Sequence, residues 1–81
     1  MNQLEVYEAI TRERIYQDKV WENKLKVGEH VALLNFYVQE LNRAWTVNSG
    51  DFMAMEVIRK IAGICVRCME QNDFPERKFD V

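Results

Sequence analysis

Residues that break helices are scarce in this chain, and the scarcity limits the folds that it can adopt. Pro75 is the only proline, and the three glycines are Gly28, Gly50 and Gly63. Folds made of many short strands need frequent turns rich in glycine and proline, whereas long helices need few. The sequence therefore predicts an all-α fold: one long helix packed on an antiparallel helical hairpin, completed by oligomerisation.

The size of the chain predicts a single helical domain over residues 1–81, with an ordered core at about 4–73 and a loose C-terminal tail. A chain this short buries only about 60% of the surface that its unfolded form exposes. The hydrophobic content of 48% is generous for that size. We therefore expect self-association into a homo-oligomer to bury the surplus.

Charge and hydropathy exclude several classes of partner. A net charge of −2 and a pI of about 5.4 argue against general nucleic-acid binding. The first residues are neither basic nor followed by an apolar run, so no signal peptide is expected. No apolar stretch reaches the roughly 18 residues that a membrane span needs. These features predict a cytoplasmic protein without membrane contact.

Hydrophobic periodicity predicts where the helices begin and end. The turn at residues 46–50 is short, so the second and third helices should form the antiparallel hairpin. Ser49 or Asp51 is the expected N-cap of the third helix. The predicted helices are Leu4 to Trp21, Gly28 to Trp45 and Asp51 to Gln71.

Apolar residues recur at helical spacing in all three segments, and we expect them to face the core. The second helix has so few polar residues that it should be nearly surrounded. On the third helix, a polar stripe is expected opposite the core face. The expected core residues are Leu4, Val6, Tyr7, Ala9, Ile10, Ile15, Val20, Trp21, Val31, Leu34, Val38, Leu41, Trp45, Phe52, Met55, Ile58, Ile61, Ala62, Cys65, Val66 and Met69, and Leu33, Phe36, Tyr37 and Ala44 widen the apolar face of the second helix. The polar stripe is Glu56, Arg59, Lys60, Gly63, Arg67 and Glu70.

Two half-acidic spacings stand on the predicted hairpin: Tyr37-x-x-Glu40 and Glu56-x-x-Arg59. Carboxylates three residues apart share a helix face, and two such pairs on neighbouring helices can hold hard divalent cations. Mg²⁺ bound in this way bridges nucleotide phosphates and activates a water molecule. This chain has only half of the carboxylates for such a site, and an arginine takes the last position.

The run Arg14-x-x-Gln17-x-x-x-Trp21, then Gly28-Glu29 and the hairpin, resembles the small MazG-like proteins. These are all-α nucleotide pyrophosphatases common in phages and prophages, and the likeness covers roughly residues 13–75. The resemblance implies an oligomeric helical bundle that encloses a nucleotide pocket.

Active MazG-like members hold Mg²⁺ with an E-x-x-E helix and an E-x-x-D helix. Glu40 corresponds to the second glutamate of the first motif, and Glu56 to the glutamate of the second. Tyr37 and Arg59 depart from the pattern, and Trp21 corresponds to the pocket tryptophan. The resemblance therefore implies a degenerate metal site in this chain.

Arginine at the metal-ligand position changes the chemistry, because a guanidinium stays protonated and would pair with Glu40 and Glu56. With Lys60 beside it, the same cation can meet a phosphate directly. The favoured hypothesis is nucleotide or cyclic-nucleotide binding with weak or lost hydrolysis, as in a phage protein that sequesters a nucleotide signal. It has no catalytic residue and no metal ligand. Its ligand-binding residues are Trp21, Tyr37, Glu40, Glu56, Arg59 and Lys60.

Three alternatives stay open. The polar stripe of the third helix can be an ordinary solvated face. Glu5-x-x-Glu8 and Glu70-x-x-Asp73 can form an intersubunit acidic set, which would make the protein a Mg²⁺-dependent nucleotide pyrophosphatase. The chain can also be an interaction module that inhibits a protein partner and binds no small molecule. Only the pyrophosphatase would need Mg²⁺ as a cofactor.

Five further residues have structural interpretations. Cys65-Val66-Arg67-Cys68 has the C-x-x-C spacing but lies inside a helical pattern, so free buried cysteines are expected. His30 is expected at the surface or an interface, and Trp45 in the core or a subunit contact. Gly63 in mid-helix marks either a helix crossing or the approach of a ligand, and the crossing is favoured.

Overall fold

The computed structural model describes residues 1–48 and 50–78, and within them it contains helices and no strand. The helices are α1 (Gln3–Val20), α2 (Val27–Arg43) and α3 (Asp51–Gln71), and a π-helical turn, η1 (Ala44–Asn48), continues α2. The predicted all-α class is confirmed. The predicted helix limits agree with the observed ones to within two residues.

Local hydrogen bonds explain where the helices start. At the start of α1, the Asn2 side chain accepts a hydrogen bond from the Glu5 N–H at 2.8 Å, and the Glu5 carboxylate accepts one from the Asn2 N–H at 3.3 Å. This reciprocal capping box satisfies two backbone donors that a helix start leaves free. At α2, Glu29 accepts a hydrogen bond from the Lys26 N–H in the same way.

The connection between α2 and α3 differs from the predicted turn. Residues up to Asn48 stay helical in the π-turn η1. Gly50, rather than Asp51, occupies the N-cap of α3, and its φ of 70° is a conformation that glycine adopts without steric cost. The prediction of Asp51 as N-cap is therefore wrong, and Ser49 lies outside the described residues.

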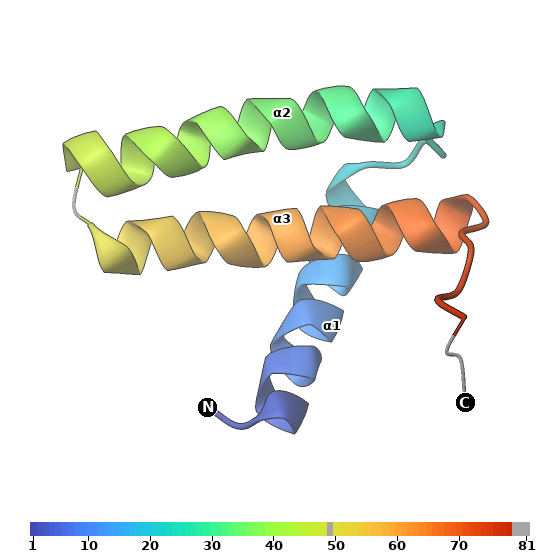
Figure 1. The fold of residues 1–81 in the computed structure, drawn as a ribbon, viewed down its shortest axis with the longest axis horizontal. Coiled ribbons are helices and arrows are strands. Elements are labelled where there is room, and N and C mark those ends of the chain that lie inside the picture. Colours follow the sequence, from blue (N-terminus) through green and yellow to red (C-terminus); the bar gives the residue numbers. More distant parts are fainter. Residues whose placement is uncertain (49, 79–81) are drawn as a thin grey trace.

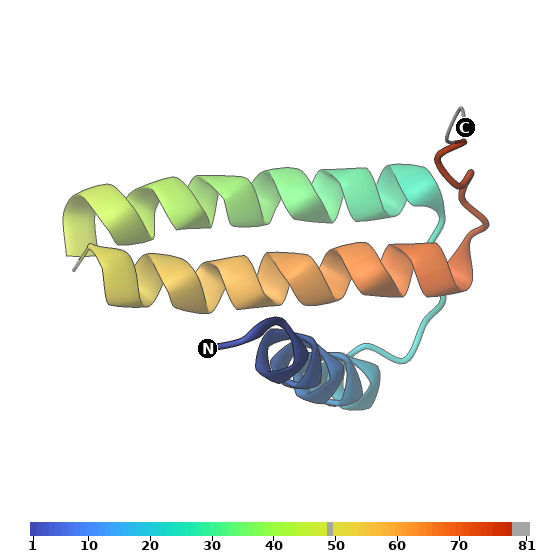
Figure 2. The ribbon, with the colours of Figure 1, turned by 60° about the horizontal axis from the view of Figure 1, so that its bottom comes forward.

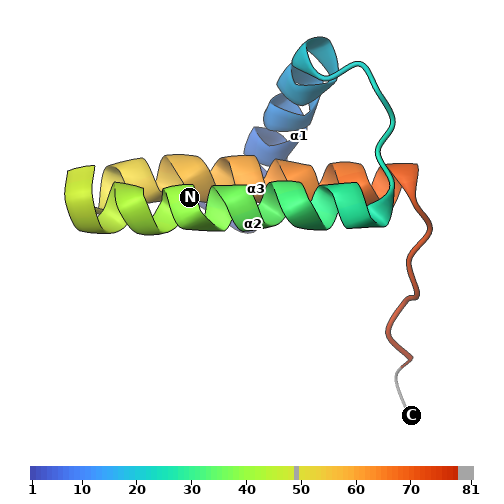
Figure 3. The same ribbon diagram turned by 90° about the horizontal axis from the view of Figure 1, so that it is seen from above.

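The arrangement in space is a hairpin with one helix laid across it. Figure 1 shows α2 and α3 side by side and antiparallel, with α1 crossing α3 at a steep angle. Figure 2 shows that α1 and α2 lie on different sides of α3, so α3 is the central helix. In Figure 3, seen from above, α1 occupies one face of the hairpin only, and no other helix covers the opposite face.

Polar residues make up most of the buried interior. Among the described residues, the buried apolar residues are Ala44, Ala54 and Ile64. The buried polar residues are Glu13, Arg14, Gln17, His30 and Arg67. In this single chain, α1 and the loop that follows it are therefore joined to α3 mainly by hydrogen bonds and ion pairs.

The predicted core faces are wrong in two helices. On α1, Leu4, Val6, Tyr7, Ile15 and Val20 are exposed, and polar residues one turn apart face α3 instead. On α3, Phe52, Met55, Ile58 and Met69 are exposed as well. The physical reason is that α1 packs on the polar side of α3, because long polar side chains can reach backbone carbonyls and opposite charges there.

The prediction that α2 is nearly surrounded is also wrong for the single chain. Val31 and Val38 are about half exposed, and His30 is the only buried residue within α2. His30 is fully buried, which corrects its predicted surface position, because its ring reaches a polar partner on α3. Trp45 is exposed and not in the core.

Candidate functional site

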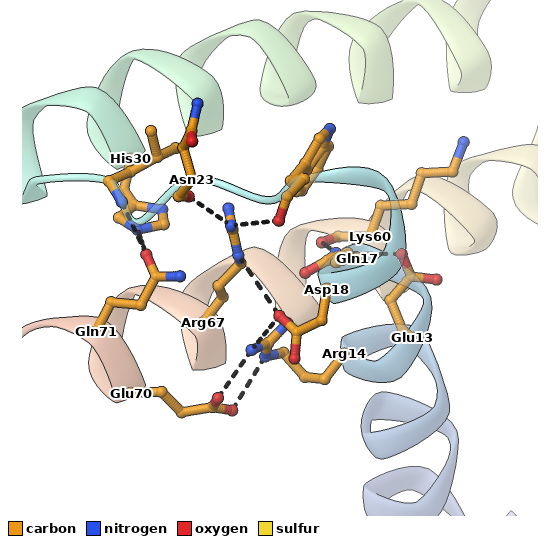
Figure 4. A network of polar contacts seen from close by, with 12 residues as sticks. Glu13, Arg14, Gln17, Asp18, Asn23, His30, Lys60, Arg67, Glu70 and Gln71 are labelled. Atoms are coloured by element: carbon orange, nitrogen blue, oxygen red, sulfur yellow. Dashed lines mark hydrogen bonds and ion pairs between the residues drawn. The ribbon is translucent and has the colours of Figure 1, made fainter.

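A polar network joins the C-terminal half of α1 to α3, and Figure 4 shows it from close by. Arg14 from α1 donates two hydrogen bonds to the Glu70 carboxylate on α3, at 3.0 and 2.8 Å. It also donates to Asp18 at 3.0 Å, one turn further along α1. The hydrogen bond to Glu70 raises the pKa of the Arg14 guanidinium above its ordinary value. Such a paired fork fixes both the distance and the direction between two helices.

Arg67 is the most deeply buried charge of the network, with 1% of its surface exposed. Its Nη2 donates to the backbone carbonyls of Trp21 at 3.0 Å and of Asn23 at 2.8 Å. Its guanidinium lies 5.5 Å from the centroid of the Trp21 ring, in cation–π contact, and Nε is 3.8 Å from Asp18. A side chain of α3 therefore holds the segment that follows α1.

Helices α1 and α3 approach each other closely at Gly63. A Cβ at this position would lie 2.6 Å from Nε2 of Gln17 and 2.8 Å from Cγ of Glu13. The Gln17 amide donates to the Lys60 carbonyl on α3 and to Glu13, each at 3.1 Å. The favoured interpretation of Gly63 as a helix crossing is therefore confirmed.

A second polar group fixes the start of α2 against the end of α3. Oε1 of Gln71 lies 3.1 Å from Nε2 of His30 and accepts a hydrogen bond from the Leu25 N–H at 3.0 Å. The Asn72 amide donates to the Leu25 carbonyl at 3.1 Å. The side chains of Gln71 and Asn72, at the end of α3, therefore hold the loop between α1 and α2 by its backbone.

A groove of about 700 Å³ lies between the N-terminal half of α1 and the N-terminal half of α3. Its walls are apolar, and two arginines and two glutamates give it a charged side. Its lining includes Ile10, Arg12, Glu13, Met55, Glu56 and Arg59. An apolar hollow with a few converging polar groups is the usual form of a small-molecule site.

Arg59 dominates the charged side of this groove. Its Nε donates to Glu13 at 3.0 Å, and its Nη2 lies 3.7 Å from Glu56. The Arg59 side chain is 43% exposed and Glu56 is 40% exposed, so the longer pair is a weak surface ion pair, worth about 0–1 kcal/mol. An incoming anion could exchange for Glu56 at small cost, while Glu13 continues to orient the guanidinium.

Only two of the six predicted ligand-binding residues line this groove, namely Glu56 and Arg59. The structure places Trp21 in a smaller hollow beside Leu25, Leu33 and Arg67. Lys60 lies next to Arg59 in sequence and does not line the groove. Its backbone carbonyl accepts the hydrogen bond from Gln17 that joins α1 to α3.

Tyr37 and Glu40 are the predicted residues on α2, and neither lines the groove. Tyr37 packs edge-on against Phe36, with ring centroids 5.2 Å apart. Within the described residues Glu40 makes no ion pair, so the pairing predicted between Glu40 and Arg59 is not observed. Glu13 from α1 makes it instead, because α1 and not α2 lies against this side of α3.

Several residues of the network were missed from the sequence. The sequence identifies Arg14 and Gln17 only as part of a motif and Arg67 only as part of the polar stripe of the third helix, and it does not single out Glu13. The available signal was a cluster of polar residues on one face of α1, at positions 13, 14, 17 and 18, together with a mid-helix glycine on α3. The motif residues Arg14, Gln17 and Trp21 thus have a structural role in this chain.

Two of the four residues of the alternative acidic set, Glu5 and Glu70, have other partners. Both oxygens of Glu70 accept hydrogen bonds from Arg14, and Glu5 caps the start of α1. No group of three or more His, Cys, Asp or Glu side chains is placed to hold a metal ion in residues 1–48 and 50–78.

The two cysteines are free, as predicted, and both are half-buried rather than fully buried. Burial raises the pKa of the Cys65 thiol, and the neighbouring Cys68 raises it further. Because the thiolate is the reactive form, we expect Cys65 in the native protein to react more slowly with a disulfide reagent at pH 8 than in urea. Time courses for the single-cysteine variants Cys68→Ser and Cys65→Ser check this, and equal native and unfolded rates for Cys65 would contradict it.

Across the described residues, no helix combines the length and the apolarity needed to cross a bilayer. Comparison of the chain with protein-family models, with curated proteins and with solved structures gave no match.

Proposed function

We propose that this protein binds a nucleotide or cyclic nucleotide in the groove between α1 and α3 and hydrolyses it weakly or not at all. One observation carries the proposal. The Arg59 guanidinium is oriented by the buried Glu13 at the edge of an apolar groove of about 700 Å³. A base or sugar would pack on the apolar walls, and a phosphate would meet Arg59 and Arg12. The resemblance of the sequence to MazG-like proteins supports the same ligand class.

The roles of the binding residues follow from their positions. Arg59 would hold a phosphate with the nitrogens that Glu13 leaves free. Glu56 would accept hydrogen bonds from a sugar hydroxyl or order a cation near the phosphate. Trp21, Tyr37, Glu40 and Lys60 do not line the groove and remain predicted ligand residues. Mg²⁺ would be essential only for the pyrophosphatase alternative, so we expect binding to persist in EDTA.

Replacing Arg59 by alanine tests the site. A hydrogen bond to a charged group contributes about 1.5–3 kcal/mol, so we expect the affinity of Arg59→Ala for the bound nucleotide to fall by about tenfold or more. Equilibrium dialysis against a panel of linear and cyclic nucleotides measures this. Arg77→Ala is the matched control, because it removes the same charge from an exposed position outside the groove. Unchanged affinity in Arg59→Ala would refute the assignment of the site.

We further propose that the protein works as a homo-oligomer. The observation that favours this is its exposed surface of 6645 Å². A compact monomer of 9.7 kDa is expected to expose about 5,100 Å², so roughly 1,500 Å² remains in excess. The radius of gyration of 14.2 Å likewise exceeds the about 11.7 Å of a compact chain of this length.

A further inference from the structure

The proposed self-association can be assigned to one face of the hairpin, starting from a stripe on α2. Its members recur at alternating steps of four and three residues, and none of them is charged. Val31, Val38 and Trp45 in this stripe are each about half exposed or more. The stripe consists of Val27, Val31, Leu34, Val38, Leu41 and Trp45. Apolar residues at this spacing form the seam of coiled coils and helical bundles.

Helix α3 has an equivalent stripe with the same alternation of three and four residues. Met55, Ile58 and Met69 in it are exposed. The stripe consists of Met55, Ile58, Ala62, Cys65 and Met69. Ala62 precedes Gly63, the residue that α1 crosses, and one residue corresponds to about 100° around a helix. The stripe on α3 is therefore rotated by about 100° from the point where α1 crosses.

The two stripes lie on the same face of the hairpin. On each helix, a stripe residue directly follows a buried one: Trp45 follows Ala44 on the α2 side, and Met55 follows Ala54 on α3. Viewed along their common axis, two antiparallel helices rotate in opposite senses, one clockwise and the other anticlockwise. On each helix the residue after the buried one is rotated by about 100° from the α2–α3 contact. The two rotations therefore bring both stripes to the same face of the hairpin. In Figure 3, α1 projects mainly to one side of the hairpin. Its N-terminal half borders the α3 stripe, because Met55, Ile58 and Ala62 line the groove between the two helices.

The chemistry of this face fits a second copy of the chain. Both stripes are uncharged, so a twofold axis would bring apolar surface onto apolar surface without opposing like charges. Stable homodimers bury about 1,000–2,500 Å² on each subunit, and the excess surface of roughly 1,500 Å² falls inside that range. Two hairpins meeting in this way form a four-helix bundle, the usual arrangement for paired antiparallel hairpins.

We infer that two copies of the protein pair through the α2 and α3 stripes into a four-helix bundle, with α1 of each copy on the outside. This inference rests on the proposed self-association. It also bears on the groove, because Met55, Ile58 and Ala62 belong both to the α3 stripe and to the groove lining. The partner copy would therefore cover the open side of the groove and supply residues to it.

Sedimentation equilibrium on the wild type and two matched variants tests this inference. Val38→Glu places a charge in the α2 stripe, where the side chain is 45% exposed in the single chain. Phe36→Glu places the same charge on the same helix at a 55% exposed position outside the stripe. We expect a wild-type mass twice the 9.7 kDa of the chain, and the same mass for Phe36→Glu. For Val38→Glu we expect a dissociation constant at least about a hundredfold higher, because a buried unpaired charge is costly.

The outcomes separate the two proposals. A monomeric wild type at micromolar concentration would overturn both self-association and the assigned face. A dimer that persists in Val38→Glu, or that is lost in Phe36→Glu, would leave self-association standing and overturn the face. A wild-type assembly larger than a dimer would overturn the two-hairpin bundle. Val31→Lys repeats the test at another half-exposed stripe position if Val38→Glu does not give a helical circular dichroism spectrum.

Discussion

Replacing Arg67 by methionine is expected to lower the free energy of unfolding by about 3–5 kcal/mol, the largest effect of any single change considered for this chain. The methionine would fill much of the same space. It would leave the carbonyls of Trp21 and Asn23 without their donor, and it would remove the cation–π contact with Trp21. Since small domains are stable by only about 5–15 kcal/mol, the variant should unfold at much lower urea concentrations.

Urea unfolding followed by circular dichroism measures this loss. Arg77→Met is the control, since it makes the same replacement at an exposed position. Arg67→Lys should fall between the two, because a lysine keeps the charge but cannot donate through a planar fork. All variants should be compared at one protein concentration, because self-association would add to the apparent stability. If Arg67→Met unfolds at the same urea concentration as Arg77→Met, the polar network does not hold the helices together.

Replacing Gly63 by alanine is expected to cost about 1–3 kcal/mol, although alanine favours helices. The added Cβ would lie 2.8 Å from Cγ of Glu13, a buried atom close to the backbone of α1. Relief of the clash would require α1 to move away from α3 and would break the hydrogen bond from Gln17 to the Lys60 carbonyl. Because α1 also forms one wall of the groove, nucleotide affinity should fall together with stability.

Gly28→Ala provides the matched control for this change. Gly28 lies in the first turn of α2, and a Cβ there would have nothing within 4 Å. This variant should be more stable than the wild type by about 0.5–1 kcal/mol, because alanine loses less backbone entropy on folding. The two substitutions are thus expected to have opposite signs in the same unfolding experiment. A Gly63→Ala variant as stable as Gly28→Ala would show that the close crossing is not a constraint.

The helix limits could be predicted because their causes are local. Asn2 and Glu5 form a capping box within four residues of chain, and the start of α3 at Asp51 was predicted although its N-cap, Gly50, was not. The antiparallel course of α2 and α3 follows from the shortness of the segment between them. Such features depend on neighbours in sequence, which is why spacing and composition were sufficient to place them.

The buried faces could not be predicted in the same way. Periodicity predicted that apolar residues would recur along one side of α2 and of α3 and would face the core. Many of these residues are exposed instead. The contacts that hold α1 against α3 join residues more than 40 positions apart, such as Arg14 with Glu70 and Arg59 with Glu13. No local pattern in a sequence shows which distant carboxylate a given arginine will meet.

The same limit applies to the candidate site. Glu56 and Arg59 were identified because they lie one turn apart on one helix, and both line the groove. Glu13 and Arg12 were missed as groove residues because α1 brings them there only through its crossing at Gly63. Polar residues therefore join α1 and the loop after it to α3, while several apolar residues of α2 and α3 stay exposed. This division explains how a chain with 48% hydrophobic residues has so few of them buried.

The fate of a retained nucleotide tests the central claim most directly. The purified protein is incubated with the panel of linear and cyclic nucleotides in EDTA and filtered, and the retained protein is then denatured and its contents separated by chromatography. The account predicts that one nucleotide leaves the filtrate and returns intact on denaturation, and that the same is seen when Mg²⁺ replaces EDTA. If every nucleotide stays in the filtrate, or if hydrolysis products appear with Mg²⁺, the claim of a non-hydrolysing nucleotide binder is contradicted.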